Sequence, residues 1–218
     1  TVSPAKGGDA RVLEADRVLQ AVGFAPRTEG FGLETTGVKL TERGAIAVDD
    51  FMRTNVDGIY AIGDCTAKLM LAHTAEAQGV VAAETIAGAE TMPINYDMIP
   101  RVTYCQPQIA SFGYTEQQAR DKGYDVKVNK FPFSANGKAW GVGDGSGFVK
   151  VVAAPRHNEL LGATIIGHDV SDLIPVLTLA QVWDITTEEV GRNIFPHPSM
   201  SEAIKDAVEG IAGEMINI

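Results

Sequence analysis

The sequence has few cysteines, few histidines and no long apolar segment, and each shortage argues against a class of protein. Two cysteines occur among 218 residues, Cys65 and Cys105, and they form neither a Cys-x2-Cys nor a Cys-x4-Cys pair. We therefore expect no disulfide framework, and isolated cysteines of this kind are most often small buried hydrophobes. The four histidines are scattered without the short spacing of metal ligands, so we predict no metal site.

Positive charge is also scarce. Lys and Arg number 18 against 28 Asp and Glu, which gives a formal net charge of -10. An acidic surface gains nothing from nucleic acid or an anionic membrane, so we expect neither as a partner. No apolar run reaches membrane-spanning length and the polar N-terminus has no secretory core, which favours a cytoplasmic protein. Apolar residues, at 45%, suffice for a sizeable core.

The sequence does contain a chemically informative run near its end, Pro196-His197-Pro198-Ser199-Met200-Ser201-Glu202. The two prolines restrict the backbone around His197, and Glu202 follows five residues later. An imidazole beside a carboxylate is typical of a general base, because the carboxylate orients the ring and stabilises the imidazolium. A structural interpretation is also open, since Ser199-x-x-Glu202 fits a capping box at the start of a helix. On spacing alone the structural interpretation is the commoner one.

The first half of the chain has the pattern of an open α/β region. Residues 18–23 form a short apolar run typical of a buried parallel strand, whose sheet partners would lie outside the printed sequence. Residues 58–64 predict a second buried strand that ends at Asp64, and open α/β sheets place ligand groups beyond the carboxyl ends of such strands. Residues 69–87 predict a long helix whose small residues recur at three- and four-residue spacing.

The composition changes over residues 91–100, which contain two prolines and an Asn and indicate a domain boundary. Beyond it we expect strands over residues 101–105, 126–133, 147–154 and 160–167, and helices over residues 116–122, 169–183, 187–193 and from 199 onward. Strands followed by grouped helices favour an α+β domain on an antiparallel sheet. Asp169 and Thr186 are predicted N-caps, and Pro175 either kinks its helix or marks the first turn.

The run from His197 to Glu202 closely resembles the His-Pro-Thr-x-Ser-Glu signature of the dihydrolipoamide dehydrogenases and related flavin disulfide reductases. The resemblance implies that His197 is the proton acceptor and that Glu202 pairs with it. It also implies a homodimer in which this pair completes the active site of the opposite subunit. The chain departs from the family at Phe195-Pro196, where His-Ala is frequent, which alters local stiffness more than chemistry.

Residues 54–64 resemble the second FAD fingerprint of the same family, which implies that Asp64 accepts hydrogen bonds from the ribitol hydroxyls of FAD. The family's FAD-contacting Met-Leu-Ala-His occurs six residues after Asp64, as Met70, Leu71, Ala72 and His73. A helix N-terminus at this point would direct free amides and positive dipole toward the flavin pyrimidine. Gly23 begins a turn similar to the one that ends the family's NAD domain, so it too is assigned to cofactor binding.

The resemblance covers nearly the whole chain, and residues 99–110, 147–150 and 161–163 resemble the family's dimerisation domain. It implies that residues 1–27 are the tail of an NAD-binding domain, 28–94 a central FAD-binding segment and 95–218 the dimerisation domain. The chain would then be the C-terminal part of a longer enzyme with FAD and NAD as cofactors and the lipoyl domains of 2-oxo-acid dehydrogenase complexes as partners. Because the sequence has no Cys-x4-Cys pair and no glycine-rich pyrophosphate loop, we expect the chain alone to be inactive.

Two alternatives remain open. The chain could act as a non-catalytic dimerisation module, or it could belong to another flavin disulfide reductase such as glutathione reductase. Glutathione reductase is disfavoured because its motif usually ends in Ser-Ser-Glu-Glu, and mercuric reductase is disfavoured because its C-terminal cysteine pair is absent from this sequence.

Overall fold

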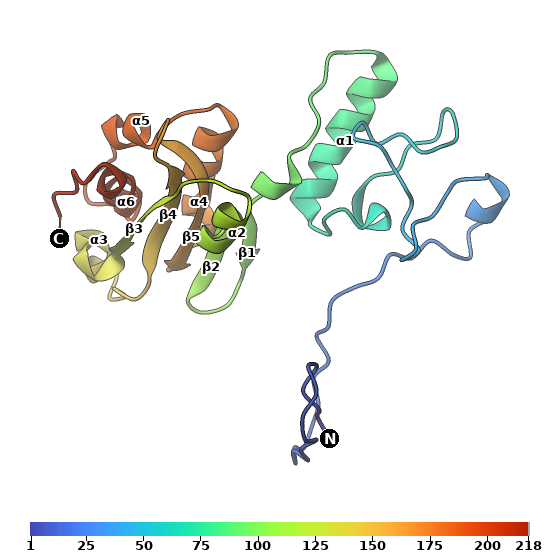
Figure 1. Cartoon of the computed structure of the whole chain (residues 1–218), viewed down its shortest axis with the longest axis horizontal. Coiled ribbons are helices and arrows are strands. Elements are labelled where there is room, and N and C mark those ends of the chain that lie inside the picture. Colours follow the sequence, from blue (N-terminus) through green and yellow to red (C-terminus); the bar gives the residue numbers. More distant parts are fainter. Residues whose placement is uncertain (218) are drawn as a thin grey trace. The chain divides into compact units, whose positions relative to one another are not determined.

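The computed structural model describes residues 1–217 and divides into two compact units, Thr1–Met92 and Pro93–Ile218 (Figure 1). The second unit begins inside the proline-containing stretch 91–100. Each unit is considered separately below.

A five-stranded antiparallel sheet forms the centre of the second unit, in the order β1-β2-β5-β4-β3 (Figure 1). Its strands are β1 (Arg101–Thr103), β2 (Gln108–Gly113), β3 (Lys127–Pro132), β4 (Phe148–Ala154) and β5 (Glu159–Gly167). The α+β fold and the antiparallel sheet expected from the sequence are therefore confirmed. The β2 strand was not predicted, because Gln, Ser and Gly interrupt its apolar pattern.

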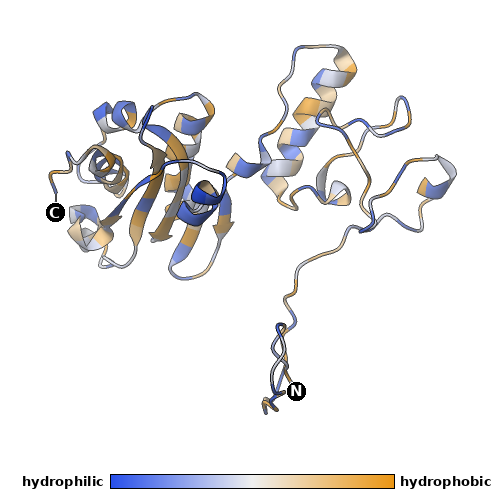
Figure 2. Cartoon of the chain, viewed as in Figure 1, coloured by the Kyte–Doolittle hydropathy of each residue, from blue (hydrophilic) through white to orange (hydrophobic). Residues whose placement is uncertain are grey.

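Five helices accompany this sheet: α2 (Glu116–Asp121), α3 (Gly137–Gly141), α4 (Val170–Val182), α5 (Thr187–Arg192) and α6 (Glu202–Ala212). Two short 3₁₀ turns, η3 (Tyr96–Met98) and η4 (Phe133–Ala135), complete the unit. Side chains alternate across each strand, so Val149 and Val151 of β4 join the main core with α4 and α6, while Val152 joins a smaller cluster with Ala119 of α2. Figure 2 shows the apolar residues of this unit gathered on the strands.

The helix boundaries test the predicted caps. Thr186 caps α5 in a complete capping box with Glu189, as predicted. Asp169 occupies the N-cap position of α4, but its side chain makes no cap bond and instead pairs with His168 at 3.0 Å, so the predicted capping role is wrong. The α4 helix begins at Val170 and continues past Pro175, which therefore does not mark its first turn.

The first unit contains α1 (Ala72–Ala87), the 3₁₀ turns η1 (Leu33–Thr35) and η2 (Gly63–Thr66), and isolated β-bridges. The strand predicted over residues 18–23 is wrong: this run is exposed, with Val18 91% accessible, and has no regular structure. A strand gains its stability from paired neighbours, and none of residues 1–217 pairs with it. The strand predicted over residues 58–64 is also wrong, since it is reduced to the single bridge between Arg53 and Tyr60.

None of the helices within residues 1–217 combines the length and the apolar character needed to cross a membrane. The same residues hold no group of three or more His, Cys, Asp or Glu side chains arranged to bind a metal ion. Both cysteines are free thiols; Cys65 is half-buried and Cys105 is exposed, so the expectation that they are buried is wrong for Cys105.

Candidate functional site

The structure brings the two predicted catalytic residues into contact. Nδ1 of His197 lies 2.9 Å from Oε1 of Glu202. His197 belongs to the loop between α5 and α6, and Glu202 is the first residue of α6. The His197 side chain is 79% exposed and that of Glu202 is 26% exposed, so the ring is open to a reactant while the carboxylate is partly shielded.

The second oxygen of Glu202 serves the helix. Oε2 accepts a 2.8 Å hydrogen bond from the backbone amide of Ser199, as a capping box requires. The serine half of the box is not formed, because α6 has Ser201 at its N-cap position and the Ser199 hydroxyl bonds to the Ser201 hydroxyl at 2.9 Å. One carboxylate therefore performs the structural role and contacts the imidazole as well.

The electrostatics of Glu202 keep it ionised. Partial burial raises its pKa, but the hydrogen bonds from the Ser199 amide and the His197 ring, helped by the charges of His197 and Lys205, outweigh burial, and the pKa lies below its usual value. A carboxylate can only accept the bond from Nδ1, so the proton of a neutral imidazole is held on Nδ1. Nε2 is then the nitrogen with a free lone pair, which is what a proton acceptor needs.

A second cluster lies in the first unit, around the predicted FAD residues. Asp64 is exposed in η2, which is tied to α1 by a 2.6 Å hydrogen bond from the Gly63 amide to Gln78 Oε1. Gly63 has φ 75, a left-handed backbone conformation that glycine adopts without steric cost. A Cβ at this position would make only an ordinary 3.5 Å contact with the Ala75 methyl, so it is the backbone conformation that favours glycine.

The start of α1 contains four of the residues that the sequence predicts to contact FAD. The helix begins at Ala72, three residues later than predicted, with His73 next and with Met70 and Leu71 before it. Leu71, at the N-cap, supplies no side-chain bond to the first-turn amides. The hydroxyl oxygen of Thr74 is buried and has no hydrogen-bond partner among the described residues. First-turn amides without a side-chain cap and a buried hydroxyl without a partner are hydrogen-bond donors. Such donors suit an acceptor-rich, negatively charged group such as the flavin pyrimidine.

Gly23 does not join either cluster. It lies in the exposed stretch without regular structure, with φ 91. Apart from its chain neighbours, no described atom lies within 4 Å of the point where a side chain at Gly23 would begin. Its predicted role in cofactor binding therefore stays a prediction.

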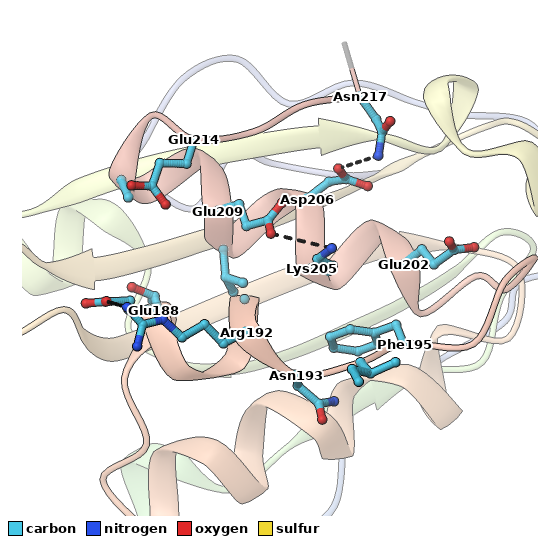
Figure 3. Close-up of a pocket in the computed structure, with 15 residues that line it drawn as sticks. Glu188, Arg192, Asn193, Phe195, Glu202, Lys205, Asp206, Glu209, Glu214 and Asn217 are labelled. Atoms are coloured by element: carbon cyan, nitrogen blue, oxygen red, sulfur yellow. Dashed lines mark hydrogen bonds and ion pairs between the residues drawn. The ribbon is translucent and has the colours of Figure 1, made fainter.

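A cavity of about 470 Å³ between α5 and α6 was not anticipated from the sequence (Figure 3). Glu202, Lys205, Asp206 and Glu209 of α6 line it, and their three- and four-residue spacing was the available signal. Lys205 Nζ lies 3.6 Å from Glu209 Oε1, and Asp206 accepts a 3.0 Å hydrogen bond from Asn217. Figure 3 marks both interactions with dashed lines. Burial raises the pKa of Asp206, and the Asn217 bond offsets only part of that effect.

Two family models match the chain. The family model for the pyridine nucleotide-disulphide oxidoreductase dimerisation domain matches residues 99–208. The model for the pyridine nucleotide-disulphide oxidoreductase itself matches residues 1–79. The chain belongs to the pyridine nucleotide-disulphide oxidoreductase family.

Several curated relatives are named dihydrolipoyl dehydrogenase. Dihydrolipoyl dehydrogenase of Mycobacterium tuberculosis is 62% identical over 218 residues, which are 100% of this chain and 47% of the relative. Dihydrolipoyl dehydrogenase of Corynebacterium glutamicum is also 62% identical, over 97% of this chain and 46% of the relative. The chain therefore spans about half the length of the curated relatives it matches.

Solved structures share the fold. LpdA from Mycobacterium tuberculosis superposes with a TM-score of 0.87 at 28% identity, covering 96% of this chain and 45% of that one. The HOCl-induced flavoprotein disulfide reductase RclA from Escherichia coli superposes with a TM-score of 0.81 at 27% identity, covering 87% of this chain and 44% of that one.

Proposed function

We propose that this chain is the C-terminal portion of a dihydrolipoyl dehydrogenase, a cytoplasmic homodimer that oxidises the dihydrolipoyl groups of 2-oxo-acid dehydrogenase complexes. The contact between His197 and Glu202 carries the proposal, because it forms within the segment that resembles the family's active-site signature. The relatives that are 62% identical bear the name dihydrolipoyl dehydrogenase. Lipoyl domains as partners, NAD as acceptor, and domain limits at residues 27 and 94 are parts of the same proposal.

The role of His197 follows from thiol chemistry. The thiolate, not the thiol, attacks a disulfide, so a dihydrolipoyl thiol must lose its proton before or during attack. Nε2 of His197 takes that proton, and Glu202 stabilises the resulting imidazolium across the 2.9 Å contact with Nδ1. The exposure of the imidazole suits a base whose substrate is delivered by another protein and whose redox disulfide belongs to the opposite subunit.

The FAD-binding part of the proposal concerns the first unit. Asp64 would accept hydrogen bonds from the ribitol hydroxyls, and the amides of Ala72 and His73 would face the flavin pyrimidine. FAD, when bound, supplies the electron transfer that links the redox disulfide to NAD. The residues of this chain contribute binding and orientation. Met70 and Leu71 would lead the backbone into that helix terminus.

The decisive experiment replaces the base in the flavoenzyme that contains this chain. His197→Gln should lower lipoamide-linked turnover by about 10²–10⁴-fold, the usual cost of losing a general base. NADH-driven reduction of an artificial acceptor and FAD content should stay near wild type, because neither needs a proton acceptor for the dithiol. His168→Gln is the matched control, since His168 is a half-buried histidine that is also paired with a carboxylate, Asp169, at 3.0 Å. Near-normal lipoamide turnover in His197→Gln would contradict the proposal.

A further inference from the structure

The loop that carries His197 is tied to a distant part of the fold by one buried side chain, Asn136. Asn136 is 4% exposed and lies between η4 and α3. Its Nδ2 donates a 3.0 Å hydrogen bond to the backbone carbonyl of Ser199, which is 63 residues away in the sequence. Its Oδ1 accepts a 2.9 Å hydrogen bond from the Ala139 amide and so caps α3. Both ends of the amide are therefore fixed by partners.

Ser199 connects Asn136 to the candidate base. The Ser199 carbonyl receives the bond from Asn136, while the Ser199 amide donates to Oε2 of Glu202. The other oxygen of Glu202 contacts Nδ1 of His197. A continuous series of hydrogen bonds thus runs from Asn136 through the Ser199 residue and the Glu202 carboxylate to the imidazole.

The imidazole needs such support because little else holds it. Its side chain is 79% exposed, so packing does not determine its orientation. An exposed ion pair or hydrogen bond contributes little and does not fix a geometry by itself. Phe195 and Met200, on either side of the loop, pack against the core and anchor the backbone, but they do not orient the carboxylate. The orientation of Glu202 depends on the Ser199 amide.

We propose that Asn136 is a positioning residue that fixes the Ser199 backbone and thereby orients the Glu202 carboxylate and the His197 ring. Its effect on catalysis rests on the proposed function, whereas its effect on the ring does not. Catalytic sites generally need residues outside the reacting groups that hold those groups in one orientation through hydrogen bonds.

Asn136→Ser removes the hydrogen bond to the Ser199 carbonyl but keeps the cap of α3. Serine is too short to reach the Ser199 carbonyl, but it caps a helix about as well as asparagine, so α3 keeps its N-cap. The matched control is Asn129→Ser. Asn129 of β3 also uses its Nδ2 to bond a backbone carbonyl of this region, that of Ala207 in α6, at 3.0 Å. The control thus removes an equivalent bridge to α6 that does not lead to His197.

The first readout is the tautomer of His197 in the 218-residue chain, measured by nitrogen NMR of isotope-labelled histidine under conditions where the ring is neutral. The wild-type ring should carry its proton on Nδ1, because Glu202 accepts there. Asn136→Ser should shift the ring toward the Nε2–H form, which imidazole prefers in water. Asn129→Ser should match wild type. Assignment of the His197 signal comes from His197→Gln.

The second readout is turnover in the flavoenzyme that contains this chain. Asn136→Ser should lower kcat with lipoamide by about 2- to 10-fold, the equivalent of one net hydrogen bond, with KM unchanged. NADH-driven reduction of an artificial acceptor should not change. If Asn136→Ser does not fold, Asn136→Asp replaces it, because aspartate has the same shape and caps helices well but cannot donate to Ser199.

A wild-type tautomer in the folded Asn136 variant, or an equal tautomer shift in Asn129→Ser, would overturn the proposal. Failure of the proposed function has a different signature, since it would leave His197→Gln active with lipoamide while the tautomer shift in Asn136→Ser persisted.

Discussion

At the residue scale, Glu202 shows how one carboxylate can stabilise a helix start and also hold an imidazole ring. Its two oxygens are used separately, one for the Ser199 amide and one for His197. A glutamine at this position could still accept the hydrogen bond from the Ser199 amide. It could not replace the contact with His197, because its neutral side chain brings no negative charge to an imidazolium. The two uses can therefore be separated by a single substitution.

Glu202→Gln should leave α6 folded, with an unfolding free energy at neutral pH lower by no more than about 1 kcal/mol. Lipoamide turnover of the flavoenzyme should fall by about tenfold or more, because the imidazolium loses its counter-charge. Denaturant unfolding followed by circular dichroism, and steady-state turnover, measure the two effects. A loss of stability without any loss of turnover would mean that Glu202 is only a helix cap.

The pH dependence of the same variant has a defined sign. The pKa of Glu202 is lowered in the folded protein, so its ionised form stabilises the fold above the ordinary glutamate pKa of about 4.3. That contribution is lost as the pH falls through the lowered folded value. The stability difference between wild type and Glu202→Gln should therefore shrink in acid, and a difference that grew in acid would contradict the assigned direction.

Asp64→Ala tests the flavin site in the same flavoenzyme. Removing a carboxylate that accepts hydrogen bonds from ribitol hydroxyls should cost about 1.5–3 kcal/mol of FAD binding, or roughly 10- to 100-fold in affinity. Fluorescence of FAD released into mild denaturant measures retention. Asp57→Ala is the control, since Asp57 is another exposed aspartate of the same segment. Equal retention in both variants and wild type would reduce Asp64 to a turn residue.

At the scale of the elements, α6 carries a buried acid at the cavity beside α5. Asp206 is buried, and burial raises its pKa while Asn217 supplies a partial compensation. A raised folded pKa means that the ionised form is penalised, so the penalty is absent in acid and complete once the pH has risen above the folded pKa. Asp206→Asn should thus unfold at higher denaturant concentration than wild type at neutral pH. The difference in stability between Asp206→Asn and wild type should disappear in acid. If Asp206→Asn were less stable than wild type at neutral pH, the fold would need the carboxylate.

The elements also show how far the sequence could predict the fold. The strands β3, β4 and β5 were predicted to within one residue at each end because each is a short run rich in apolar residues, and α5 because its capping box is local. The strand predicted over residues 18–23 was wrong because the apolar run has the composition of a buried strand but no neighbouring strand pairs with it. Periodicity reports on one segment and not on its partners.

The candidate site divides in the same way. His197 and Glu202 lie five residues apart, so their contact could be predicted from a short motif. The contact between Asn136 and Ser199 spans 63 residues and depends on how η4 and the α5–α6 loop meet across the fold. No local pattern at Asn136 distinguishes a helix cap from a residue that also supports the loop carrying His197, because its capping role accounts for the asparagine fully.

At the scale of the whole molecule, the two units differ in what they contain. The second unit has a complete five-stranded sheet and its own core between the sheet, α4 and α6. The first unit has one long helix, two 3₁₀ turns and isolated bridges, and the strand predicted over residues 18–23 has no sheet. We therefore expect only the second unit to fold independently.

Residues 95–218 should fold as an independent α+β unit and associate as a two-fold dimer, because a dimerisation domain with a complete core needs no help from the first unit. The 218-residue chain should likewise be dimeric. It should also be colourless, since its sequence has no glycine-rich strand–loop–helix to grip the FAD pyrophosphate and the Asp64 and α1 contacts alone are too few to retain flavin. Light scattering and the visible absorption spectrum measure the two properties, with the complete flavoenzyme as the yellow reference. A monomeric 95–218 fragment would contradict the first expectation, and a yellow 218-residue protein would show that Asp64 and α1 form a stronger flavin site than their contacts suggest.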